Sequence, residues 1–280
     1  MRPLPPVSVV ELFPRERASL LSVLGALSES EWSAPTACAG WSVHDVALHL
    51  LGDDVGILSR ERDGHVDQSG SEGLDLSQWE QLLAYINSRN AEWVTATRRI
   101  SPRLLCEMLA FTGERVYQHF AGCDLGALGG AVSWAGPGPA PVWLHVAREY
   151  TERWMHQQHI RDAVGRPGMK EPRWFAPVLA TFVRALPHTL RTVAAPNGTS
   201  LKLAITGPAG GEWYVVRQDE GWQLTADAVA APEATVAIDQ EMAWRLFTKG
   251  LTKEAALPHV TQEGDARLTG RVLEMVSIIA

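Results

Sequence analysis

Hydrophobic positions in the first two thirds of the chain recur every three or four residues, a spacing that places them on one face of a helix. This spacing predicts four long helices, at residues 14–27, 43–63, 77–94 and 102–116. A further helix is predicted at Pro141–Gly165 on other grounds, because this stretch has helical length, no proline or glycine inside it, and Gly165 and Pro167 as stop signals at its end. A long glycine- and proline-rich loop leads into the helix at Pro141. The pattern therefore predicts a helical bundle with one long crossover connection.

Beyond Ala194–Thr199 the hydrophobic spacing changes to two, which is typical of β-strands. Residues 201–205 alternate in this way, and the stretch EWYVVRQDEGWQLTA predicts a hairpin that turns at Asp219–Gly221. We therefore predict two domains, a helical one at residues 1–192 and a small α+β one at residues 193–280.

Composition and charge narrow the class of protein. The chain has 46% hydrophobic and 20% charged residues, a net charge of −7 and no run of lysine or arginine, so we expect neither a nucleic-acid partner nor a membrane partner. The stretch MRPLPPVSVVELF lacks the apolar region of a signal peptide and no apolar run approaches about 18 residues, so we expect a cytoplasmic protein. The three cysteines are scattered, which predicts free thiols. We interpret Cys38 as an inert packing residue of a loop.

Five polar residues of the helix at Pro141–Gly165 fall within an arc of about 80° of its surface. They are His145, Glu149, Glu152, His156 and His159. Within this set, Glu152 and His156 lie one turn apart, so both side chains can reach a single ion. Carboxylates alone would indicate a solvated face, but three histidines favour a metal site, because histidine is the commonest metal ligand. Such a site needs another ligand from elsewhere in the chain.

His49 lies at the edge of the apolar face of the helix predicted at residues 43–63. It follows Asp45 by one turn and precedes Asp53 by one turn. A histidine in this position is usually a packed, hydrogen-bonded core residue, and the two aspartates can orient it or change its charge.

Two segments resemble the N-terminal domain of mycothiol-dependent maleylpyruvate isomerases, within the wider DinB-like superfamily. They are PTACAGWSVHDVALHLLGDD and REYTERWMHQQHIRDAVGRPG. The C-terminal segment resembles the sterol-carrier-protein-like domain often fused to it. The resemblance covers nearly the whole chain. It implies a fold class of α plus α+β, with a DinB-like four-helix bundle followed by a small α+β sterol-carrier-protein-like domain.

The resemblance also implies a metal site. In that family a divalent metal, usually zinc, is held by one histidine of the second helix and by a Glu-x-x-x-His pair, which carry over to His49, Glu152 and His156. Three protein ligands and an open position are typical of a catalytic metal. Asp53 is a candidate to orient His49 or to contact the substrate, and equally a solvated helix residue. His159 stands where the family often has aspartate; it is a candidate acid or base, a partner of a ligand, or an exposed histidine.

The activity implied by the resemblance is a metal-dependent isomerase or S-transferase that uses mycothiol as a thiol co-substrate. In the isomerase branch, mycothiol adds to the cis double bond of maleylpyruvate, the bond rotates and the thiol leaves, giving fumarylpyruvate. We expect a small electrophile and a low-molecular-weight thiol as partners, and a monomer or homodimer. Zinc is the expected metal, although the same ligands accept nickel or iron. Two alternatives remain, a metal-dependent hydrolase and a non-catalytic metal- or ligand-binding protein.

Overall fold

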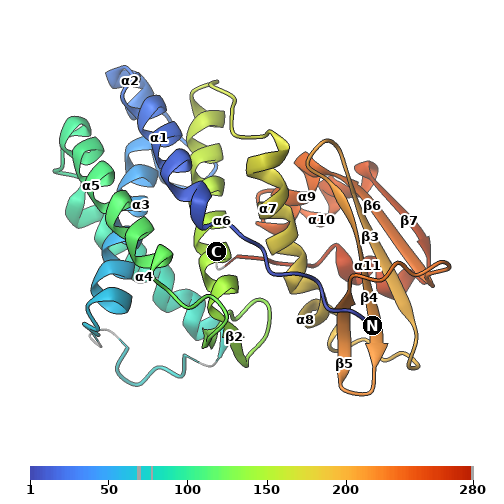
Figure 1. Cartoon of the computed structure of the whole chain (residues 1–280). Helices are drawn as coiled ribbons and strands as arrows, with labels where there is room; N and C mark the ends of the chain where they lie inside the picture. Colours follow the sequence, from blue (N-terminus) through green and yellow to red (C-terminus); the bar gives the residue numbers. More distant parts are fainter. Residues whose placement is uncertain (68–70, 77, 279–280) are drawn as a thin grey trace. The chain divides into compact units, whose positions relative to one another are not determined.

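Figure 1 shows the computed structural model of the chain, which describes residues 1–67, 71–76 and 78–278. A helical N-terminal region is followed by a sheet-containing domain, so the predicted fold class is confirmed. Contacts divide the chain into two compact units. The helical unit is Val9–Cys123 with Glu152–Met169, and the sheet unit is Met1–Ser8, Asp124–Thr151 and, within the described residues, 170–278. The domain boundary between residues 192 and 193 stays a prediction.

The long helices that the sequence predicts are present. They are α1 (Phe13–Leu24), α3 (Val43–Ile57), α4 (Trp79–Thr97), α5 (Pro102–Ala121) and α6 (Val142–Ala163). In the helical unit α5 contacts both α1 and α3, and α3 also contacts α4 (Figure 1). The core between them is formed by buried aliphatic side chains such as Leu20, Leu50, Leu105 and Ile160. A short helix α2 (Glu29–Trp32) and a π-helical turn (Leu58–Arg62) complete the unit.

Helix ends follow the local sequence. Ser42 and Asp45 form a capping box at the start of α3, in which the Ser42 hydroxyl accepts from the Asp45 backbone N–H and the Asp45 carboxylate accepts from the Ser42 N–H. Helix α6 ends just before Gly165, whose φ of +64° is accessible to glycine at low cost. Helix α4 begins at Trp79, and Ser77, where we predict its start, lies outside the described residues.

A buried ionic group connects four helices of the helical unit. Asp54 of α3 is fully buried and accepts hydrogen bonds from Arg17 of α1, at 2.7 and 3.0 Å, and from Arg153 of α6, at 2.8 Å. The hydroxyl of Thr112 on α5 donates to the same carboxylate at 2.7 Å. Arg17 also donates to the backbone oxygen of Leu109 on α5 at 2.6 Å. Every helix that carries a candidate site residue is therefore tied to Asp54.

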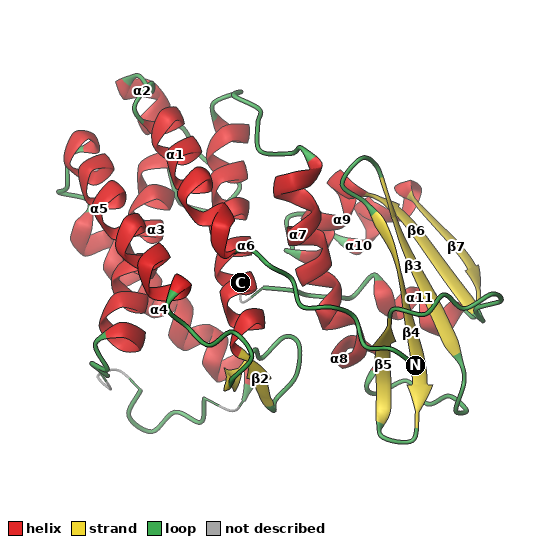
Figure 2. Ribbon diagram, viewed as in Figure 1, coloured by secondary structure: helices red, strands yellow, loops and turns green. Residues whose placement is uncertain are grey.

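The sheet unit contains a five-stranded sheet in the order β5-β4-β3-β6-β7 (Figure 2). Its strands are β3 (Ser200–Thr206), β4 (Gly211–Gln218), β5 (Gly221–Thr225), β6 (Ala234–Asp239) and β7 (Val260–Gly264). Strands β3 and β6 are parallel and the other neighbours are antiparallel. The predicted strand at residues 201–205 and the hairpin turn at Asp219–Gly221 are both confirmed.

Helices pack against this sheet in the same unit. Contacts with the strands come from α8 (Leu186–Leu190), α9 (Gln240–Phe247) and α11 (Ala266–Val272). Helix α7 (Pro172–Phe182) packs on α9, as does the short α10 (Lys253–Ala256). A two-stranded sheet of β1 (Leu128–Ala131) and β2 (Pro139–Pro141) lies in the loop before α6. None of the helices in the described ranges is long and apolar enough to span a bilayer.

We expect Asp54→Asn to destabilise the protein by about 3 kcal/mol, because the substitution leaves two buried guanidinium groups without their counter-charge. The midpoint of urea unfolding, followed by far-ultraviolet circular dichroism, measures this change. Asp63→Asn is the matched control, because Asp63 is an exposed aspartate paired with Arg62, and its loss should leave the midpoint of urea unfolding nearly unchanged. Equal effects of the two substitutions would contradict the role assigned to Asp54.

The same carboxylate should make stability depend on pH in the acid range. Burial alone would raise the pKa of Asp54, but Arg17 and Arg153 outweigh it and hold the pKa below the ordinary 3.8. The stabilisation by Asp54 is therefore fully present above pH 3.8 and is lost as the pH falls through the pKa of the folded state. The difference in unfolding free energy between wild type and Asp54→Asn should stay constant from neutral pH down to about pH 3.8 and shrink at lower pH. A difference that shrinks well above that value would refute this assignment.

Candidate metal and thiol site

Three buried histidines come together inside the helical unit, one from α3 and two from α6. The ring centroids of His49 and His156 are 4.7 Å apart, and those of His156 and His159 are 5.4 Å apart. The exposed fractions of these residues are 7%, 7% and 9%. The ionic group at Asp54 includes Arg153, which precedes His156 by three residues on α6.

Of the three metal ligands that the family resemblance implies, His49 and Glu152 each lie beside His156. Glu152 Oε2 lies 3.7 Å from His156 Nε2, and the His49 ring faces the His156 ring edge-on. Asp53 Oδ2 lies 3.5 Å from His49 Nε2, where it can orient the imidazole. This arrangement brings the donor groups of two helices together, and the roles of these residues stay predictions.

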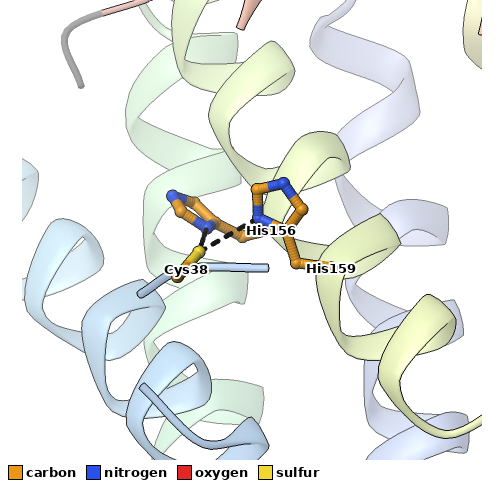
Figure 3. Close-up of side chains that lie close together, drawn as sticks. All are labelled: Cys38, His156 and His159. Atoms are coloured by element: carbon orange, nitrogen blue, oxygen red, sulfur yellow. Dashed lines mark hydrogen bonds between the residues drawn. The ribbon is translucent and has the colours of Figure 1, made fainter. Parts of the chain in front are cut away.

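Cys38 is also part of this group, which sequence reasoning missed. Its Sγ lies 3.2 Å from His159 Nδ1 and 3.9 Å from His156 Nδ1 (Figure 3). One donor atom from each of the three residues lies within 4.8 Å of the other two. The prediction that Cys38 is only a packing residue is therefore incomplete, because its thiol also contacts two histidines. The interpretation of His159 as an exposed histidine is wrong, because the residue is buried.

A short hydrogen-bonded loop before α3 holds Cys38 at this point. The hydroxyl of Thr36 donates to the Trp41 carbonyl at 2.9 Å and accepts from the Cys38 N–H at 3.2 Å. The Trp41 N–H donates to the Cys38 carbonyl at 3.0 Å, which closes the turn. Gly40 has a φ of +79°, a conformation that favours glycine. The Trp41 ring then packs 5.1 Å from the His49 ring, which joins the loop to the histidines.

Burial keeps the uncharged forms of two of these groups. It lowers the pKa of His156 well below 6.5, and the neighbouring His49, His159 and Arg153 lower it further. Burial also raises the pKa of the Cys38 thiol to about 11, an effect that the Thr36 hydrogen bond opposes and the Glu152 carboxylate reinforces. A neutral imidazole presents a nitrogen lone pair, which is the form that binds a metal.

The other two residues of the polar arc on α6 have a different partner. Arg148 donates to Glu149 Oε1 at 2.5 Å and approaches His145 Nδ1 at 3.1 Å. These three residues belong to the sheet unit, whereas Glu152, His156 and His159 belong to the helical unit.

The donor set of the helical unit fits a divalent transition metal. It offers imidazole nitrogens, a carboxylate oxygen and a thiol sulfur, all of which bind zinc. Buried histidines that face one another and a cysteine are costly unless they share a proton or an ion. The group is therefore a possible metal site.

Comparison with known proteins identifies the N-terminal part of the chain. The family model of the mycothiol maleylpyruvate isomerase N-terminal domain matches residues 13–161, which is more than half of the 280 residues. No curated protein matches the sequence.

Two solved structures share the fold over nearly the whole chain. The crystal structure of the mycothiol-dependent maleylpyruvate isomerase is 12% identical, with 95% of this chain and 98% of that chain covered and a TM-score of 0.55. A histidine-to-alanine mutant matches with the same coverage and TM-score at 11% identity. The match to a sterol carrier protein 2 like 2 from Aedes aegypti covers 35% of this chain and 95% of that chain, at 21% identity and a TM-score of only 0.27.

The raised pKa of Cys38 predicts slow alkylation at neutral pH in chelator-treated protein, because the thiolate is the reactive form. Its rate of reaction with iodoacetamide, measured by peptide mass spectrometry, should keep rising until the pH reaches about 11. A synthetic peptide of residues 35–41 is the control and should reach its maximum rate at lower pH. A plateau for Cys38 at or below pH 9.0, the ordinary value, would show that burial does not control this thiol.

Proposed function

The chain belongs to the mycothiol maleylpyruvate isomerase N-terminal domain family, and from this premise we propose a metal-dependent enzyme that uses mycothiol to act on a small electrophile. The observation that carries the proposal is the packing of the His49 ring against the His156 ring, with centroids 4.7 Å apart, and the position of Glu152 beside His156. These residues come from two helices that the buried Asp54 group holds together.

Different side chains would bind the metal ion and position its ligands. His49, Glu152 and His156 would hold the ion, zinc being the expected metal. When bound, the ion lowers the pKa of a coordinated thiol so that the thiolate forms at neutral pH. Asp53 would position the His49 ring through its carboxylate, 3.5 Å from Nε2. Burial lowers the pKa of His156 well below 6.5, which favours the neutral ring that can bind a metal.

The reaction class follows from what a thiolate does to an electrophilic carbon. Addition of the sulfur to a cis double bond leaves a single bond that can rotate, and expulsion of the same sulfur restores the double bond in the trans form. No atom is gained or lost, so the thiol is regenerated. With an electrophile that carries a leaving group, the sulfur stays attached while the leaving group departs with the electron pair of its bond to carbon, and the reaction is an S-transfer. We place maleylpyruvate isomerisation first because the chain belongs to the isomerase's domain family.

The proposal is tested on purified protein by metal analysis and by assays with mycothiol and maleylpyruvate, or with mycothiol and 1-chloro-2,4-dinitrobenzene. We expect bound metal, conversion that depends on the thiol, and loss of both after chelation. His156→Ala should lose the metal and lower kcat/KM by at least about 100-fold, since even removing a partner of a metal ligand costs about 10–100-fold.

His65→Ala is the matched control, because His65 is an exposed histidine of the helical unit, and it should leave metal content and rate unchanged. A protein that binds no metal and converts neither substrate with mycothiol would exclude this function. Metal-dependent ligand binding without any conversion would favour a non-catalytic binding protein.

A further inference from the structure

The ring of His156 faces a different donor group with each of its two nitrogens. Its Nε2 lies 3.7 Å from Glu152 Oε2, whereas its Nδ1 lies 3.9 Å from Cys38 Sγ. The ligand set implied by the family uses Glu152 and leaves Cys38 out. The Nδ1 side brings its own buried partner, because His159 Nδ1 lies 3.2 Å from the same sulfur.

We propose that Cys38, His156 and His159 together bind a divalent transition-metal ion when no external thiol is present. The proposal deepens the proposed function, since it rests on the presence of an ion beside His156. It assigns that ion a thiolate donor from the protein itself, on the Nδ1 side of the ring.

The spacing of the donor atoms fits this assignment. In a tetrahedral zinc site, bond lengths of about 2.3 Å to sulfur and 2.05 Å to nitrogen place a sulfur and a nitrogen ligand about 3.6 Å apart. The two separations from Cys38 Sγ, 3.2 and 3.9 Å, lie on either side of that distance. A single ion bound to the sulfur and to Nδ1 of both rings would account for both separations at once.

The environment of the three residues supports a formed site. The loop that carries Cys38 is fixed by Thr36 and Trp41 through four hydrogen bonds. Both histidines lie on consecutive turns of α6 and are buried. Glu152 then lies on the far side of the His156 ring, where a carboxylate commonly receives the second N–H of a metal-bound imidazole.

The first test uses cobalt(II) as the probe, with the full chain and no added thiol. A thiolate ligand gives cobalt(II) an intense near-ultraviolet charge-transfer band that nitrogen and oxygen ligands do not give. We expect this band in the wild type, its loss in Cys38→Ser and its retention in Cys106→Ser, which removes a half-buried thiol elsewhere in the helical unit. Circular dichroism establishes that the variants are folded.

Each other outcome overturns the proposal. Stoichiometric cobalt binding without the band would exclude a thiolate ligand and leave the metal-dependent function standing. A band that persists in Cys38→Ser would assign the thiolate to another residue. Failure to bind cobalt at all would remove both this site and the metal-dependent function.

A second measurement is made first on the wild type and so does not depend on the folding of Cys38→Ser. Zinc should slow the alkylation of Cys38 in the wild type at least about 10-fold and leave Cys106 unaffected, because a metal-bound thiolate is shielded from the reagent. His159→Asn should weaken this protection at a fixed zinc concentration. Equal alkylation of Cys38 with and without zinc would also overturn the proposal.

Discussion

The helical unit depends on one buried carboxylate that two guanidinium groups neutralise. Asp54 follows His49 by five residues on α3, and its partner Arg153 precedes His156 by three residues on α6. A buried ion pair tolerates little displacement, because a charge without its partner in the interior costs several kcal/mol. The pairing of Asp54 with Arg153 therefore fixes α3 against α6, and with them the 4.7 Å separation of the two histidine rings.

The surroundings of α6 show why its polar residues do not mark a solvent-facing side. Gln157 donates to Glu16 at 2.6 Å and accepts from Arg161 at 2.9 Å, and all three residues are buried. Burial raises the pKa of Glu16, although Arg17 and Arg153 act against this shift. Hydrogen bonds between buried or half-buried polar side chains thus connect α1 to α6. Hydrophobic spacing distinguishes inside from outside only where the interior is apolar, and along α6 it is not.

This explains which parts of the site could be predicted from the sequence. The Glu152 and His156 pair follows from helical geometry alone, and the capping box at Ser42 follows from local hydrogen bonding. His49 as a ligand required the resemblance, since its own surroundings indicate only a packed histidine. Cys38 lies 118 and 121 residues from its two histidine neighbours. A local sequence pattern cannot predict a contact between residues so far apart in the chain. Strand β7 (Val260–Gly264) was likewise not predicted, because its polar sequence becomes a strand through pairing with β6.

The two ring nitrogens of His156 make its neighbours interdependent. A neutral imidazole carries its proton on one nitrogen and its lone pair on the other, and the hydrogen bond made by one nitrogen decides the role of the other. A carboxylate beside Nε2 favours a proton on Nε2. The lone pair then lies on Nδ1, on the side of Cys38 and His159. If Glu152 instead binds the ion, the same lone pair must lie on Nε2, and Nδ1 becomes a donor towards the sulfur. The protonation of a single buried ring therefore couples the acidic side of the site to its thiol side. The Glu152 carboxylate also raises the pKa of the Cys38 thiol directly, even though the two residues belong to different segments of the chain.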